Sequence, residues 1–193
     1  MAEYYLISQL PSLDGINENT SLPITEEGFL ELCSRFLSKK ALCEIKNLTL
    51  SPKLDFEKSS SALIEKWNLG ESELRLALSK ARAEKLNKTV ENKNQNLPIE
   101  LTKIAATAVE MQSPLEAELF LLQYRLNLLE GFRPMDNFSE DFVFYYGLKL
   151  KLLLRVRKFD KNLGETTYKN IYNSIINGDS LEDKIWPRIL VRL

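Results

Sequence analysis

The sequence contains no histidine, and this absence excludes more chemistry than any other feature of its composition. Without histidine the chain cannot form a Ser-His-Asp or Cys-His nucleophile, a histidine-ligated zinc site or the Glu-x-x-His di-iron motif of helical bundles. Its two cysteines, Cys33 and Cys43, are too few for a thiolate metal cage and lack CxxC spacing. We therefore expect no metal site and two reduced thiols.

Glycine and long apolar runs are also scarce. The seven glycines form neither a GxGxxG nor a GxxxxGK[ST] pattern, so a phosphate-binding loop is missing. No segment approaches the roughly 20 apolar residues that span a bilayer. The first residues lack the basic and apolar regions of a signal peptide. We therefore expect a cytoplasmic protein that is not an enzyme, has no catalytic residues and binds no cofactor.

What the sequence does contain is typical of a globular domain. Of its 193 residues, 44% are hydrophobic and 27% are charged, which argues against a disordered or fibrous chain. The 26 basic residues nearly balance the 27 acidic ones, whereas a general nucleic-acid binder usually has a marked basic excess. We expect a single helical domain over residues 1–193. The alternative is a subdivision of this domain near the polar linker at residues 87–98.

The spacing of apolar residues predicts an all-α fold, an irregular bundle of six to eight helices. The clearest helix runs from Ser59 to about Lys88. Its apolar or small residues recur at alternating intervals of four and three, at Leu63, Trp67, Gly70, Leu74, Ala77 and Ala81. Such a narrow stripe faces one partner along the helix, so we expect one arm of a long helical hairpin with its tip at residues 87–98.

Two other segments differ from an ordinary amphipathic helix. Residues 4–10 are aromatic and β-branched and end before Pro11, which predicts a short extended N-terminal segment. A helix that starts after Asn137 or Ser139 and continues to about Phe159 is apolar nearly all round, as is typical of the buried centre of a domain.

The polar stripe of that central helix consists of three basic residues, Lys151, Arg155 and Lys158. One interpretation is a solvated edge whose long side-chain stems cover apolar surface. The other is an electrostatic contact with an acidic protein face or an anionic surface. Binding of phosphate or RNA has no recognition motif to support it.

Three stretches of the chain together resemble one bacterial family. The first joins Tyr4-Tyr5-Leu6-Ile7 and Leu10-Pro11 to Phe29-Leu30-Glu31-Leu32-Cys33. The second is Trp67-x3-Glu71-x2-Leu74-Arg75-x2-Leu78-x3-Arg82-Ala83-x2-Leu86. The third is Tyr146-x-Leu148-x-Leu150-x-Leu152-Leu153-x-Arg155, followed by Phe159-Asp160 and Leu163-Gly164. They are similar to a bacterial family of unknown function that is encoded within V-type (A/V-type) ATPase operons, in the place of the C-type central-stalk protein (d-type in eukaryotic nomenclature).

The resemblance implies an all-helical socket that sits on the membrane proteolipid ring and receives the foot of the rotor stalk. Such a part would pass torque between ion flow and nucleotide chemistry from the cytoplasmic face of the membrane, as a peripheral protein. The C-type central-stalk proteins are longer and built from three related helical units, whereas this chain has no internal repeat and would form only part of the funnel. The candidate partner-binding residues are Arg75, Arg82, Lys151, Arg155 and Lys158.

Two other classes of function stay open on the sequence. One is a generic cytoplasmic helical adaptor or scaffold unrelated to ATPases, which would expose an apolar groove to its partner. The other is an RNA- or phosphate-binding module, whose binding would depend steeply on salt concentration. Because the net charge is only −1, we expect no nucleic-acid partner.

Overall fold

The computed structural model describes residues 2–16, 21–52, 61–88, 96–158 and 161–176. Over these residues the fold is all-helical, as predicted, and contains no strand. The helices are α1 (Ala2–Gln9), α2 (Glu26–Phe36), α3 (Lys39–Lys46), α4 (Ala62–Lys85), α5 (Ile99–Glu110), α6 (Pro114–Gly131), α7 (Glu140–Arg157) and α8 (Lys161–Ile176). The chain divides into two compact units, residues 1–156 and residues 157–193. The predicted linker and hairpin tip at residues 87–98 fall within the sequence range of the first unit, and residues 89–95 of it lie outside the described residues.

The N-terminal segment is helical, and the prediction of an extended segment over residues 4–10 is wrong. Helix α1 contacts α2, and Leu6 is completely buried in the core while Tyr4 and Tyr5 are exposed. Aromatic and β-branched residues favour strands only where a neighbouring strand can pair with their backbone. No strand occurs in the described residues, so a helix, which satisfies its own backbone groups, is the stable alternative.

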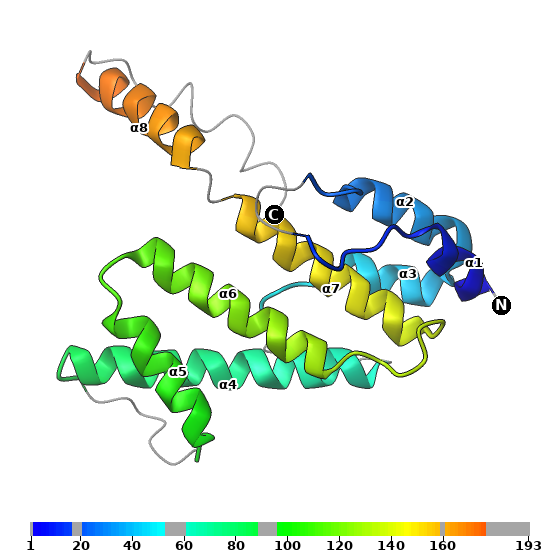
Figure 1. Ribbon diagram of the computed structural model, residues 1–193, viewed down its shortest axis with the longest axis horizontal. Helices are drawn as coiled ribbons and strands as arrows, with labels where there is room; N and C mark the ends of the chain where they lie inside the picture. Colours follow the sequence, from blue (N-terminus) through cyan, green and yellow to red (C-terminus); the bar gives the residue numbers. More distant parts are fainter. Residues whose placement is uncertain (1, 17–20, 53–60, 89–95, 159–160, 177–193) are drawn as a thin grey trace. The chain divides into compact units, whose positions relative to one another are not determined.

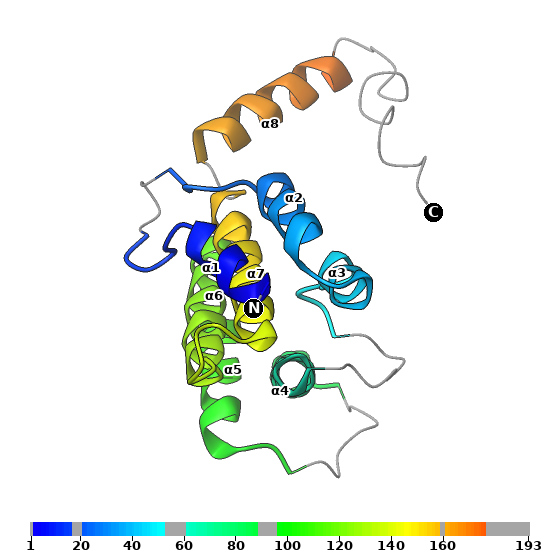
Figure 2. The ribbon, with the colours of Figure 1, turned by 90° about the vertical axis from the view of Figure 1, so that its right-hand side faces the viewer.

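Helix α7 is the buried centre of the first unit, as its all-round apolar pattern predicted. All of its residues from Val143 to Leu150 are buried. Figures 1 and 2 show α7 between the α2–α3 pair on one side and α6 on the other. The surrounding side chains form the main core, which includes Leu6, Phe29, Cys33, Ile45, Leu48, Leu63, Trp67, Leu122 and Leu129.

Helix α4 is the long arm of the predicted hairpin. The hydroxyl of Ser61 caps it by accepting a hydrogen bond from the Leu63 amide at 3.2 Å. Helix α5 packs against α4, but it has 12 residues to the 24 of α4 and crosses it obliquely (Figure 1). The two helices share a second cluster with α6, the α4–α5 core, formed by Leu74, Ala77, Leu78, Leu101, Ala105, Ala108 and Leu121.

Two glycines allow close packing against these helices. A Cβ at Gly70 of α4 would lie 2.9 Å from Cδ2 of Leu128 on α6. The lack of a side chain at Gly70 therefore leaves room for the Leu128 side chain. A Cβ at Gly147 of α7 would lie 3.2 Å from Cε1 of Phe29 and 3.3 Å from Cδ2 of Leu48. Because Phe29 and Leu48 are themselves buried, the contact at Gly147 leaves little room for adjustment.

Helix α8 belongs to the second unit. From Tyr168 onward its apolar residues recur at three- and four-residue intervals and are exposed: Tyr168, Ile171, Tyr172, Ile175 and Ile176. The rings of Tyr168 and Tyr172 stack with their centroids 6.0 Å apart. None of the described helices combines the length and the apolar character that crossing a bilayer requires.

We expect Gly147→Val to lower the free energy of unfolding by about 1–3 kcal/mol, because the added methyl groups must displace Phe29 and Leu48. The matched control is Gly131→Val at the end of α6, where an added Cβ has no neighbour within 4 Å, and its effect should stay within about 0.5 kcal/mol. Urea unfolding followed by circular dichroism measures both. Equal losses at the two positions would contradict this account of the core.

Candidate functional site

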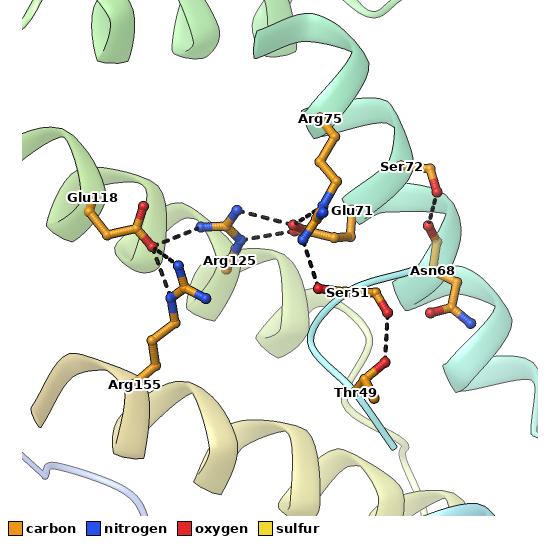
Figure 3. Close-up of polar contacts among 9 residues, drawn as sticks. All are labelled: Thr49, Ser51, Asn68, Glu71, Ser72, Arg75, Glu118, Arg125 and Arg155. Atoms are coloured by element: carbon orange, nitrogen blue, oxygen red, sulfur yellow. Dashed lines mark hydrogen bonds and ion pairs between the residues drawn. The ribbon is translucent and has the colours of Figure 1, made fainter. Parts of the chain in front are cut away.

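Charged side chains link helices α4, α6 and α7 through one ion-pair network (Figure 3). Its members are Arg75, Glu71, Arg125, Glu118 and Arg155. At its centre the carboxylate of Glu71 on α4 is only 1% exposed. Arg125 of α6 donates from Nε to Glu71 Oε2 at 2.9 Å and from Nη2 to Glu71 Oε1 at 3.0 Å. This paired geometry is the strongest arrangement available to an arginine and a carboxylate.

The outer members extend the network to the surface. Arg75, one turn after Glu71 on α4, donates from Nε to Glu71 Oε1 at 3.0 Å and from Nη2 to the hydroxyl of Ser51 at 3.0 Å. Arg155 of α7 donates from Nε and Nη2 to Glu118 Oε1 of α6 at 2.9 and 2.6 Å. The structure therefore brings Arg75 and Arg155, two of the predicted partner-binding residues, into one network.

The Glu71–Arg125 pair lies where the two cores meet. On α4, Glu71 stands between Trp67 of the main core and Leu74 of the α4–α5 core. On α6, Arg125 follows Leu121 and Leu122, which belong to different cores. Because an unpaired buried charge costs several kcal/mol, the pair fixes the position of α4 along α6.

A second polar cluster ties the N-terminal segment to the central helix. Lys149 Nζ of α7 donates to Asp14 Oδ1 and to Glu130 Oε1, both at 2.6 Å, and contacts the hydroxyl of Tyr145 at 3.3 Å. We call these four residues the Lys149 cluster. The residues after α1 are thereby held against α7 and the end of α6.

The electrostatics of the Lys149 cluster favour its charged forms. Burial disfavours the ammonium of Lys149, but its hydrogen bonds to Asp14 and Glu130 outweigh burial and raise its pKa. The hydrogen bond from Lys149 lowers the pKa of Asp14. Partial burial acts to raise the pKa of Glu130, but hydrogen bonds from Lys149 and Tyr145 outweigh it, and that pKa is lowered too. Burial raises the pKa of Tyr145 to about 12, so its hydroxyl stays protonated.

The other predicted partner-binding residues lie apart from this network. Lys151 of α7 pairs with Glu26 of α2. Arg82 of α4 is exposed, and so is Lys158, which directly follows α7 in sequence and belongs to the second unit. No described residue forms an ion pair with Arg82 or Lys158.

Sequence reasoning missed Arg125, Glu118 and Lys149 as partners in these contacts. A signal for Arg125 was present, because it stands three residues after Leu122 and four before Leu129 on the apolar side of α6. A charged residue at such a position predicts a buried pair. The identity of its partner, Glu71, carries no local signal, since the two residues are far apart in sequence.

The charged groups of the network are engaged with one another in ion pairs. Within the described ranges, no group of three or more Cys, Asp or Glu side chains could hold a metal ion. Cys33 and Cys43 are both free thiols, and burial raises the pKa of Cys33 to about 12, which leaves almost no reactive thiolate at neutral pH. No protein-family model, curated protein or solved structure matches the chain.

We expect Arg125→Met to lower the free energy of unfolding by about 3 kcal/mol or more, because it leaves the Glu71 carboxylate buried with only Arg75 to pair with it. Arg35→Met, which breaks an exposed pair with Glu31 on α2, should cost less than about 1 kcal/mol. Denaturant unfolding measures both.

The double variant Glu71→Leu/Arg125→Met separates the pair from general damage to the fold. Replacing both charges with apolar side chains removes the desolvation cost of the ions, so the double variant should recover most of the stability that Arg125→Met loses. Glu71→Leu alone is the second single variant. If the double variant loses as much stability as the two single variants together, the two side chains are not coupled.

The Lys149 cluster predicts a defined dependence of stability on pH. Because the pKa values of Asp14 and Glu130 are lowered in the folded protein, their contribution is present above about pH 4 and is lost as the pH falls through the folded-state values. The raised pKa of Lys149 keeps its contribution until the pH exceeds about 10.

The difference in unfolding free energy between the wild type and Lys149→Met should therefore be constant between about pH 5 and pH 10 and shrink at lower pH. Urea unfolding across this pH range measures it. Lys66→Met, at an exposed position on α4, should show no such change. A difference that grows in acid would contradict the assignment.

Proposed function

We propose that the protein is a non-catalytic, central-stalk-like component of a V-type (A/V-type) ATPase. In this role it links the rotor stalk to the membrane proteolipid ring and helps couple ion transport to ATP hydrolysis or synthesis. It acts as a peripheral protein on the cytoplasmic face of the membrane. The proposal starts from the three stretches that resemble the family encoded in V-type ATPase operons.

The observation that supports it is that the first two stretches, and residues 146–155 of the third, lie in the first unit. The first supplies Leu6, Phe29 and Cys33 to the main core. The second is α4 with Glu71 and Arg75, and the third is α7 with Arg155, so it is these two stretches that carry three members of the ion-pair network. Residues 159 and 160 of the third stretch lie outside the described residues, and its last two residues, Leu163 and Gly164, belong to α8 of the second unit. Part of the family pattern thus coincides with residues that link the helices of the first unit.

A part that transmits torque must resist sliding between its helices. Moving α4 by one turn along α6 shifts it by about 5.4 Å. This shift would separate the Glu71 carboxylate from the Arg125 guanidinium and leave each with only the partner on its own helix, Arg75 and Glu118. Apolar contacts alone are less directional and would allow neighbouring registers more easily. The network therefore suits a stiff connector.

The exposed cations supply candidate contacts for the rotor stalk or the proteolipid ring. Arg75, Lys151 and Arg155 already pair within the chain, whereas Arg82 and Lys158 are exposed without a described ion-pair partner. Charges at the rim of an interface set association rate and specificity. In this proposal Arg82 and Lys158 face acidic groups of the neighbouring ATPase proteins.

A helical adaptor unrelated to ATPases is the second candidate. The observation that favours it is the exposed apolar stripe of α8, which has the spacing that amphipathic helices present to a groove in a partner protein. The two candidates differ in the proteins that would be recovered with the full chain.

Purification of the tagged full chain from native membranes should recover rotor-stalk and proteolipid proteins, and deletion of its gene should lower ion transport per ATP hydrolysed. Arg82→Glu should weaken recovery by about tenfold, which corresponds to about 1.4 kcal/mol. Lys66→Glu reverses an exposed charge on the same helix and serves as its control. A free monomer together with intact coupling in the deletion strain would refute the proposal.

A further inference from the structure

Helix α8 separates apolar from polar side chains along its length. The exposed apolar residues from Tyr168 onward, which we call the α8 stripe, are Tyr168, Ile171, Tyr172, Ile175 and Ile176. At 3.6 residues per turn they lie within about 140° of the helix circumference. The opposite face carries Asn170, Asn173 and Ser174, which are polar and uncharged. The helix is therefore amphipathic, but its polar face offers no charge to a partner.

Two tyrosines form part of the α8 stripe. Tyr168 is 67% exposed and Tyr172 is 52% exposed, and their rings stack on each other. A tyrosine ring is apolar along its body and polar at its hydroxyl, so it favours a boundary between water and an apolar phase. Tyrosine is accordingly enriched at the level of lipid headgroups.

The segment that contains the α8 stripe is basic, although the net charge of the whole chain is −1. The basic residues of residues 157–176 are Arg157, Lys158, Lys161 and Lys169, and the acidic ones are Asp160 and Glu165. The excess of positive charge in this segment means that the remaining residues are acidic on balance. An anionic surface therefore attracts the α8 segment more strongly than the rest of the chain.

Lys169 is the cation that lies next to the α8 stripe. It is exposed, and no described residue forms an ion pair with it. It stands three residues before Tyr172, so the two side chains are neighbours on the helix surface. Glu165, one turn earlier, is also exposed and reduces the local positive charge without reversing that of the segment.

We propose that α8 lies flat on an anionic lipid surface. The α8 stripe occupies the boundary between headgroups and acyl chains, which removes its apolar area from water. The ammonium of Lys169 meets headgroup phosphates, while its stem covers apolar surface. Asn170, Asn173 and Ser174 face the solvent.

A groove in a partner protein also covers amphipathic helices, but the composition of α8 favours lipid. A protein partner of defined specificity uses charges at the rim of the contact, and the polar face of α8 carries none. A lipid surface requires neither matched charges nor a matched shape. It requires an apolar face, residues suited to the headgroup level and a positive segment, and α8 has all three.

The inference deepens the proposed function and rests on it only for the presence of a membrane. The cytoplasmic leaflet carries anionic lipids, so a protein held there by an ATPase would find this surface beside it. Arg82 and Lys158 stay assigned to acidic groups of proteins. Helix α8 adds a direct contact with lipid.

The test is sedimentation of the full chain with vesicles of phosphatidylcholine, with or without phosphatidylserine. The vesicles that contain phosphatidylserine should bind the chain at least about tenfold more tightly. Raising the salt from about 0.1 M to about 1 M shortens the Debye length from about 10 Å to about 3 Å and should weaken this binding.

Variants of exposed α8 residues locate the contact. The double variant Ile171→Ser/Ile175→Ser should weaken binding by at least about tenfold, because two large apolar side chains no longer enter the lipid. Asn170→Ser on the opposite face is its matched control and should bind as the wild type does. Lys169→Glu should weaken binding to the vesicles that contain phosphatidylserine, whereas Lys66→Glu on α4 should not. Circular dichroism verifies that each variant retains its helices.

Equal binding to the two kinds of vesicle, or unchanged binding of the double variant, would overturn the proposal. Self-association in analytical ultracentrifugation that the double variant abolishes would assign the α8 stripe to a second copy instead. If the chain binds no vesicle but the double variant loses a protein recovered from native membranes, the stripe belongs in a protein groove. The vesicles hold no ATPase protein, so failure of the ATPase co-purification leaves the vesicle result standing, and the reverse also holds.

Discussion

The buried pair between Glu71 and Arg125 is the interaction on which the arrangement of the first unit depends. It lies on α4 and α6 where the main core meets the α4–α5 core. Well-packed apolar residues at these positions would stabilise the fold as much or more. The charged groups add specificity, because the guanidinium and the carboxylate can pair only when α4 has one position along α6. Two clusters of apolar side chains, which separately tolerate small shifts, are thereby held in a single arrangement.

Helix α7 extends the same principle to segments that are distant in sequence. It is buried along most of its length, yet Lys149 uses its long stem to bring an ammonium from within the core to Asp14 and Glu130. Tyr146 donates from its hydroxyl to the carbonyl of Pro11 at 2.8 Å. Apolar packing therefore places α7 at the centre of the first unit. Hydrogen bonds from its polar side chains hold the segment after α1 against it.

The sequence predicts those features of the fold that depend on nearby residues. Thr25 and Ser113 cap α2 and α6 as local signals indicate, and the all-round apolar pattern of α7 identifies the central helix. The sequence also contains the Glu71–Arg75 pair, four residues apart. It does not predict Arg125 as the second partner of Glu71, because periodicity gives the face of a helix and not what lies opposite. For α1 the same limit applies, since the choice between strand and helix depends on the neighbours available.

The internal ion pairs also determine which charges remain for partners. Arg155 is 44% exposed, but Glu118 accepts two hydrogen bonds from it, so its field toward solvent is largely cancelled. The basic stripe read from sequence thus consists of residues with different roles, because Lys151 and Arg155 bind α2 and α6 within the first unit. Attraction of an external partner depends on charges and apolar rings without such a contact. In the described part of the chain, Arg82 of α4 is an exposed cation without a described ion-pair partner, and Tyr4, Tyr5 and Phe138 are exposed rings. The first unit therefore offers a partner fewer unpaired cations than the basic stripe in the sequence suggests.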